Sequence, residues 1–146
     1  MPSVTLCSSA AFYRQVVDVA DQLMARGFTV FVPETAEKMQ QRGNFEVAAV
    51  KTWYTNPDHY HEKTRLMEAH FAKVREGDAT LVLNYTKNGV DGYVGGAVLM
   101  EMLVAYQHKK PIYLLHPVSD ACGLKEDVLG LRPVLLDGDL SRLPGA

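Results

Sequence analysis

Short apolar runs alternate with longer amphipathic segments along this chain. The apolar runs are rich in residues that favour extended structure, and they predict strands over residues 3–7, 28–33, 79–85, 111–115 and 133–136. Between them, apolar residues recur at helical spacing and predict helices over residues 11–27, 34–41, 59–76, 93–106 and 124–130. Strands that alternate with helices are typical of a parallel sheet covered on both faces. The pattern therefore predicts an α/β domain with a flavodoxin-like, doubly wound sheet of about five parallel strands.

Small polar residues stand at the expected ends of several elements. Ser8 and Ser9 follow the first strand and are predicted to cap the next helix, and Asp58 is predicted to cap the helix after it. In doubly wound sheets, ligands bind beyond the carboxyl ends of the strands. The segments expected at that edge of the sheet are residues 7–9, 84–96 and 116–119.

The composition, the net charge and the cysteine spacing exclude several classes of protein. A chain of 146 residues with 47% hydrophobic and 22% charged residues is typical of one globular domain, here residues 1–146. A formal net charge of −2 gives no basic surface for nucleic acid, and no apolar run approaches the roughly 18 residues of a membrane span. The two cysteines, Cys7 and Cys122, lack the spacing of a disulfide framework or a zinc site. The start of the chain shows no signal-peptide pattern, so the protein is expected to be cytoplasmic. Neither a metal nor a cofactor is expected.

Three short patterns admit a structural explanation as well as a functional one. Six residues separate Cys7 from Arg14, one more than the phosphate cradle of tyrosine phosphatases requires, which argues against that class. Gly95 and Gly96 stand where a helix begins, so they can form an anion-binding site or simply a tight turn. A third group can line a pocket for a flat base or pack in the core, and it consists of Trp53, Tyr54 and Tyr60.

Glu101 is the one charged residue between residues 92 and 106. In a helix with about 100° per residue, Lys110 lies opposite Glu101 and Gln107 lies about 120° away, which would place Glu101 on the inner side. His108 shares the side of Glu101, however, so a solvent-exposed stripe explains the carboxylate equally well. Periodicity leaves both interpretations open.

The segment "VTLCSS" before a helix, and above all the block "GDATLVLNYTKNGVDGYVGGAVLMEMLVAYQHKKPIYLL", resemble the nucleoside 2-deoxyribosyltransferase superfamily, which includes nucleotide N-glycosidases. The resemblance covers most of the chain. In that family, a glutamate early in this helix attacks the anomeric carbon of a deoxyribosyl group and releases the base. The resemblance implies that Glu101 is this nucleophile. It also implies a homo-oligomer, a dimer or larger, in which a neighbouring subunit completes the pocket.

Three positions depart from the family pattern. His70 stands where the family carries an aspartate that helps to protonate the leaving base, and Gly95 stands where well-known members have aspartate or serine. Thr5 stands where a tyrosine on the first strand orients the nucleophile. The acid or base that assists Glu101 is therefore expected to be His70 or Asp91.

These observations predict an enzyme that cleaves or transfers the N-glycosidic bond of a nucleoside or nucleotide. The alternative is a non-catalytic nucleotide-binding or sensing module on the same fold. The partner is expected to be a small molecule, with no role for nucleic acid or a membrane. The sequence does not select the base, the sugar or the number of phosphates. The predicted substrate-binding residues are Cys7, Ser8, Ser9, Asn84, Tyr93, Gly95 and Gly96.

Overall fold

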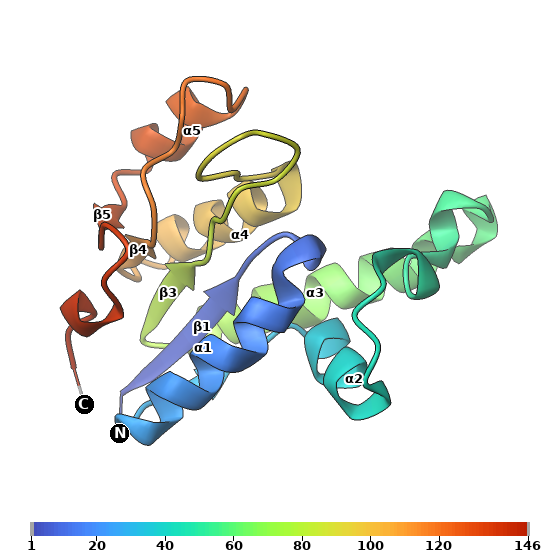
Figure 1. Ribbon diagram of the computed structural model, residues 1–146, viewed down its shortest axis with the longest axis horizontal. Helices are drawn as coiled ribbons and strands as arrows, with labels where there is room; N and C mark the ends of the chain where they lie inside the picture. Colours follow the sequence, from blue (N-terminus) through green and yellow to red (C-terminus); the bar gives the residue numbers. More distant parts are fainter. Residues whose placement is uncertain (1, 146) are drawn as a thin grey trace.

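The computed structural model describes residues 2–145 and contains one five-stranded sheet (Figure 1). All of its strand pairs are parallel, and the strand order is β2-β1-β3-β4-β5. This order is that of flavodoxin-like doubly wound sheets, so the predicted fold class is confirmed. The strands are β1 (Ser3–Cys7), β2 (Thr29–Phe31), β3 (Ala79–Val82), β4 (Ile112–Leu114) and β5 (Val134–Leu135).

The central strands β1 and β3 are the best buried. Their register pairs Val4 with Ala79 and Cys7 with Val82, so both strands end at the same edge of the sheet. Most of their side chains are almost fully enclosed because helices cover both faces. The strand predicted over residues 79–85 ends at Val82, and the chain then turns into the glycine-rich loop that precedes the next helix.

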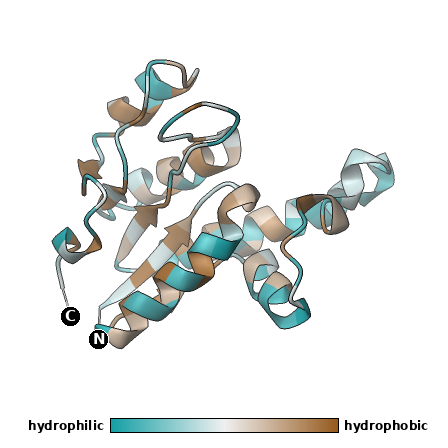
Figure 2. Cartoon of the chain, in the orientation of Figure 1, coloured by the Kyte–Doolittle hydropathy of each residue, from teal (hydrophilic) through white to brown (hydrophobic). Residues whose placement is uncertain are grey.

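Helices pack on both faces of the sheet. Residues of α1 (Tyr13–Ala25) and α2 (Glu34–Arg42) join one core cluster, and residues of α3 (Tyr60–Glu76), α4 (Gly96–Gln107) and α5 (Lys125–Gly130) join the other. Figure 2 shows apolar and polar residues alternating along α1, as its position between the core and solvent requires. None of the helices in residues 2–145 combines the length and the apolar character needed to cross a bilayer.

Three short 3₁₀ turns separate α2 from α3, in a segment for which no helix or strand is predicted. They are η2 (Val47–Ala49), η3 (Thr52–Tyr54) and η4 (Pro57–His59). Figure 1 shows the first turns of α3 projecting beyond the sheet with this segment folded beside them. Two further 3₁₀ turns are η1 (Ala10–Phe12), which leads into α1, and η5 (Leu140–Arg142).

The two predicted helix caps differ in detail from the observed ones. Ser9 occupies the N-cap position of η1, where its carbonyl accepts the Phe12 N–H at 3.0 Å, but neither serine side chain makes a capping hydrogen bond. The hydroxyl of Ser8 donates to the Ser9 carbonyl, and Ser9 Oγ accepts a hydrogen bond from Lys87. Before α3, Asn56 rather than Asp58 is the capping residue, since its side-chain oxygen accepts a hydrogen bond from the backbone N–H of Asp58 at 3.1 Å. The 3₁₀ turn η4 moves the start of the helical segment upstream, so Asp58 lies inside it.

Helix α4 does not have the polar outer side that the sequence suggested. The helix ends at Gln107, so Lys110 lies beyond it and does not mark its solvent side. The outer side instead exposes Met100, Leu103 and Tyr106, with 41%, 44% and 55% of their surfaces accessible. The solvent-facing stripe of α4 is therefore apolar, and its carboxylate faces elsewhere.

Candidate active site

A cavity of about 270 Å³ opens at the carboxyl ends of the central strands, and Glu101 lines it. Its walls come from the loop after β1, the starts of α1 and α2, the 3₁₀ segment, α3 and the first turns of α4. Glu101 lies in the second turn of α4 and points into this cavity. The inward interpretation of the lone carboxylate agrees with the structure.

Glu101 forms a cluster with Cys7 and His70. Cys7 is the last residue of β1, and His70 comes from α3. One ligand atom from each of the three side chains lies within 4.8 Å of the other two. The Cys7 Sγ atom is 3.5 Å from His70 Nε2, and Cys7 is completely buried. Three elements that are distant in the sequence therefore meet at the nucleophile candidate.

Burial dominates the electrostatics of Glu101. Desolvation raises the pKa of its carboxyl group from 4.5 to about 8, although the Cys7 thiol and the Lys63 ammonium group both act to lower it. The side chain keeps some contact with the cavity, but surrounding protein atoms replace most of its hydration. Near neutral pH the carboxyl of Glu101 is therefore mainly protonated, and it becomes a carboxylate as the pH passes about 8.

His70 is held neutral. Desolvation, and then the charge of Lys73, lower its pKa to about 4 despite a hydrogen bond to the backbone of Leu6. The Leu6 carbonyl accepts this bond at 3.0 Å, which assigns the ring hydrogen to Nε2 of His70. A neutral imidazole has no second proton to give at neutral pH. Its predicted role as acid or base stays a prediction, in which the neutral ring is better suited to accept a proton than to donate one, and its Nε2–H contacts β1 through the Leu6 carbonyl.

Tyr13 is a site residue that the sequence analysis missed. It begins α1, lines the cavity, and has its pKa raised by burial and then by the nearby Glu101 and Cys7. A neutral phenol close to the carboxyl group can donate a hydrogen bond to it. Thr5, which stands at the family's tyrosine position, donates instead to the Lys73 carbonyl at 2.9 Å. The signal available in the sequence was a tyrosine soon after the first strand, because the chain there lies at the ligand-binding edge of the sheet.

One end of the cavity gathers hydrogen-bond donors. Gly95 and Gly96 line it at the start of α4, where the Leu99 N–H makes a hydrogen bond to the Gly95 carbonyl. The amides that precede Leu99 in the helix have no acceptor within the helix, and the helix dipole adds positive potential there. A Cβ atom on Gly96 would meet nothing within 4 Å, so this glycine leaves space on the cavity side.

Lys87 adds a positive charge to the same end. Its Nζ atom donates to Ser9 Oγ at 3.2 Å and lies 4.9 Å from the centre of the Tyr93 ring. Lys87, Ser8, Ser9 and Tyr93 all line the cavity. Predicted binding residues thus meet here with a lysine that the sequence analysis did not select, because loop residues carry no periodic signal.

Another part of the wall carries aromatic and basic residues from the 3₁₀ segment. Trp53 is buried and lines the cavity with Tyr54, which is exposed to solvent over 66% of its surface. Tyr60 is exposed and is not part of the cavity wall, so only two of the three aromatic candidates contribute. Two further lysines line this wall, namely Lys51 and Lys63.

Three predicted residues do not line this cavity, since Cys7 is completely buried next to His70 and the other two lie elsewhere. Asn84 and Asp91 line a second, more open cavity of about 580 Å³. Asn84 is completely buried, and its amide holds two loops together through bonds to Gly92 and His116. Asp91 accepts a hydrogen bond from Thr86 at 2.8 Å. Asn84 thus holds two loops together, and its predicted binding role stays a prediction. Asp91 does not line the cavity of Glu101, because the two sides of the loop face different cavities.

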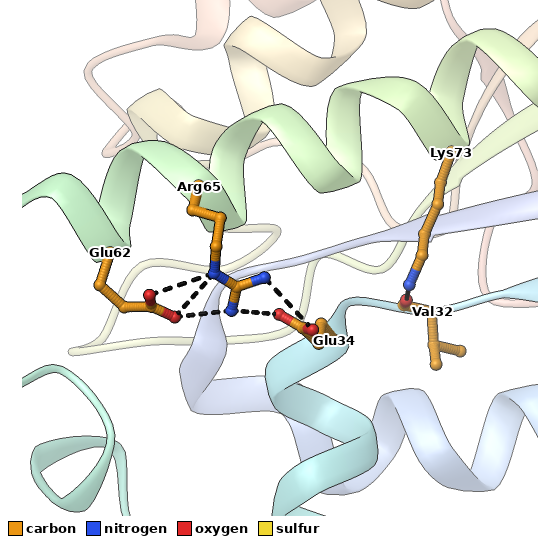
Figure 3. A network of polar contacts seen from close by, with 5 residues as sticks. All are labelled: Val32, Glu34, Glu62, Arg65 and Lys73. Atoms are coloured by element: carbon orange, nitrogen blue, oxygen red, sulfur yellow. Dashed lines mark hydrogen bonds and ion pairs between the residues drawn. The ribbon is translucent and has the colours of Figure 1, made fainter.

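The glutamate at the start of α2 is already engaged. Glu34 lines the cavity, but Arg65 binds its carboxylate at 2.7 Å and also binds Glu62 at 2.6 Å (Figure 3). The same figure shows Lys73 donating to the Val32 carbonyl at 2.7 Å. These contacts fix α3 against α2 and the end of β2, and they leave Glu101 as the cavity carboxyl group without a basic partner in contact among residues 2–145.

The Cys7, His70 and Glu101 cluster also has the spacing of metal ligands. However, His70 Nε2 already donates to Leu6, and burial raises the pKa of the Cys7 thiol so that it keeps its proton. The Nε2 atom of His70 is thus engaged within the protein, whereas its Nδ1 atom is buried without a hydrogen-bond partner among residues 2–145. Comparisons of the chain with protein-family models, curated proteins and solved structures give no match.

Proposed function

We propose that the cavity binds a nucleoside or nucleotide and that Glu101 attacks its anomeric carbon, so that the N-glycosidic bond is cleaved or its sugar transferred. The observation that carries this proposal is the position of Glu101, a carboxyl group on a cavity wall beside the Tyr13 hydroxyl and the Cys7 thiol. The resemblance of the segment around Glu101 to the deoxyribosyltransferase superfamily supports the same chemistry.

The chemistry suits a partly desolvated carboxylate. Breaking an N-glycosidic bond builds positive charge on the anomeric carbon and the ring oxygen. A carboxylate beneath the sugar interacts strongly with that charge because little water screens it, and it can form a covalent ester with the sugar. Water, or a second base, then attacks the ester and restores Glu101. Tyr13 lines the same cavity, and a hydrogen bond from its O–H to Glu101 would orient the carboxyl group.

Base release is the activity to measure. The protein is incubated with a panel of ribo- and deoxyribonucleosides and their 5′-monophosphates, and free base is separated by chromatography. We expect time-dependent release from at least one member, and a second free base in the mixture distinguishes transfer from hydrolysis. If no member of the panel yields free base, the enzymatic proposal is wrong.

The donor-rich end of the cavity favours a phosphorylated ligand. A 5′-monophosphate is expected to raise the melting temperature more than the matching nucleoside, because its phosphate reaches Lys87 and the free amides of α4. Gly96→Val is expected to remove the difference, since its side chain would enter the open space at this end. Differential scanning fluorimetry measures both shifts.

The matched control is Gly123→Val. A Cβ atom added at Gly123 would also meet nothing within 4 Å, and Gly123 does not line the cavity. This variant should therefore keep the extra shift of the monophosphate. Equal shifts for nucleoside and monophosphate in the unmodified protein would show that the Gly95–Gly96 turn is only structural.

A non-catalytic binding module is the second candidate. The raised pKa of Glu101 favours it, because a protonated carboxyl group can donate a hydrogen bond to a ribose hydroxyl as well as accept one. The two candidates both bind the ligand, but only the enzyme releases base. A melting-temperature shift without turnover would identify the binding module.

We also propose that the chain forms a homo-oligomer through the outer side of α4. Met100, Leu103 and Tyr106 recur at a spacing of three residues and form an exposed apolar stripe on α4 itself. A second copy can cover this stripe symmetrically. The stripe and Glu101 share α4, so association would also affect the cavity.

Light scattering at micromolar concentration is expected to show a dimer or larger assembly. Leu103→Glu should shift the protein toward monomer, because it places a charge in the middle of the apolar stripe. Met24→Glu is the control, since Met24 is similarly exposed on α1, on the other face of the sheet. A monomeric unmodified protein, or equal effects of both substitutions, would contradict this proposal.

A further inference from the structure

Lys63 lies on the cavity face of α3. It is seven residues before His70, which is two helical turns, so both side chains lie on the same face of the helix. Both residues line the cavity. The Lys63 ammonium nitrogen is 5.7 Å from the centre of the buried Trp53 ring, so this aromatic wall helps to hold the charged group beside the cavity.

The donors of Lys63 are available to a ligand. Within residues 2–145, Lys63 has no hydrogen bond and no ion pair, whereas Lys51, Lys73 and Lys87 each donate to a protein oxygen. Desolvation and then the charge of Lys51 lower the pKa of Lys63, while Glu101 and Tyr54 act in the opposite direction. A cationic donor that gives up its proton more easily than an ordinary lysine thus faces the same cavity as Glu101.

The other groups near the cavity are poorly suited to donate a proton to a leaving base. His70 is neutral at neutral pH, and Asp91 lines a different cavity. Glu34 is bound by Arg65 and its pKa is lowered, so it is ionised and has no proton to donate. Lys87 is engaged with Ser9 at the donor-rich end. None of these residues can therefore take over the role of the aspartate that serves as the acid in the deoxyribosyltransferase superfamily.

We propose that Lys63 is the general acid that protonates the departing base, an inference that rests on the proposed N-glycosidic chemistry. As the bond from the anomeric carbon to the base nitrogen breaks, its electron pair stays with the base and one Lys63 Nζ–H proton moves to a ring nitrogen or carbonyl oxygen. A Glu101 oxygen forms the new bond to the anomeric carbon. In the second step, water adds its hydroxyl to the sugar, breaks the Glu101 ester and returns a proton to Lys63.

The test compares two leaving groups in the full-length protein. One substrate is an unmodified purine nucleoside 5′-monophosphate, and the other carries a methyl group on N7, so that its base departs as a neutral molecule without needing a proton. Lys63→Met is expected to slow release of the unmodified base by about 10²-fold or more, the usual contribution of a general acid. Release of the methylated base should fall by less than about 5-fold. Lys63→Arg should show the same selectivity, because guanidinium keeps the charge but holds its proton.

Lys87→Met is the control. It removes a positive charge from the donor-rich end of the same cavity, and it is expected to change both substrates by the same factor because both carry a 5′-phosphate. Equal losses on the two substrates in Lys63→Met would show that Lys63 only binds or shapes the cavity, and would overturn its role as acid. The proposed function itself fails only if the unmodified protein releases base from no member of the nucleoside and monophosphate panel, which is a different result from equal losses on the two substrates.

Discussion

Glu101→Gln is expected to slow base release by at least about 10²-fold, the scale observed when one preorganised electrostatic group is removed from an active site. Glutamine keeps the size of glutamate and most of its hydrogen bonding, but it has no negative charge and cannot form the ester. Ligand affinity should change far less than the rate, because the lost interaction is stronger in the transition state than in the ground state. Initial rates by chromatography and ligand-induced melting shifts measure the two quantities.

The control for this substitution is Glu68→Gln. Glu68 lies on the exposed side of α3 and does not line the cavity, so its replacement removes the same charge from the chain at a distance from the site. The rate of this variant should match that of the unmodified protein. A Glu101→Gln protein that releases base at the unmodified rate would end the assignment of Glu101 as nucleophile.

The stability of the folded protein is expected to fall as the pH rises through the range in which Glu101 titrates. The folded state raises the pKa of Glu101 from 4.5 to about 8, so within this window the folded state binds more protons than the unfolded state. The contribution of this pKa shift to the free energy of unfolding is complete below about pH 4.5 and is lost as the pH rises through about 8. From pH 6.5 to pH 8.5, the loss is about 2 kcal/mol, because each pH unit below the folded pKa contributes about 1.4 kcal/mol.

Denaturant unfolding of the unmodified protein and Glu101→Gln at pH 6.5 and pH 8.5 measures this effect. His70 acts in the opposite direction, since its lowered pKa removes stability as the pH falls from 6.5 to about 4, so the comparison stays above that range. The difference in unfolding free energy between the two proteins should move in favour of the glutamine variant as the pH rises. A difference that does not change with pH would mean that Glu101 is better hydrated than its position indicates.

The fold could be predicted because its signal repeats along the chain. Each strand is a short apolar run and each helix has an apolar stripe, and the alternation of the two determines a parallel sheet. The 3₁₀ segment of residues 47–59 could not be predicted in the same way. Its turns are only three residues long, and Asn56 rather than Asp58 supplies the cap through a local hydrogen bond.

The site could be predicted only where the resemblance supplied a position. Glu101 came from the resemblance, since its helical periodicity allowed both orientations and its polar marker Lys110 lies outside α4. Tyr13 and Lys87 reach the cavity from a helix start and a loop, and Lys63 reaches it from an outer turn of α3. These residues reach the cavity only because three elements pack together, and no local sequence pattern encodes that packing.

The dependence of base release on pH tests the central claim most directly, because it identifies the protonation state of Glu101 that acts. The quantity to measure is kcat/KM for the unmodified protein between pH 6 and pH 9, since this ratio reports the ionisation of the free enzyme. A nucleophilic carboxylate predicts a rise of about tenfold per pH unit that levels off near pH 8, followed by a decline where Lys63 loses its proton. A rate that is constant below pH 8 and falls above it would show that the protonated carboxyl group is the active form, and would contradict the assignment of Glu101 as nucleophile.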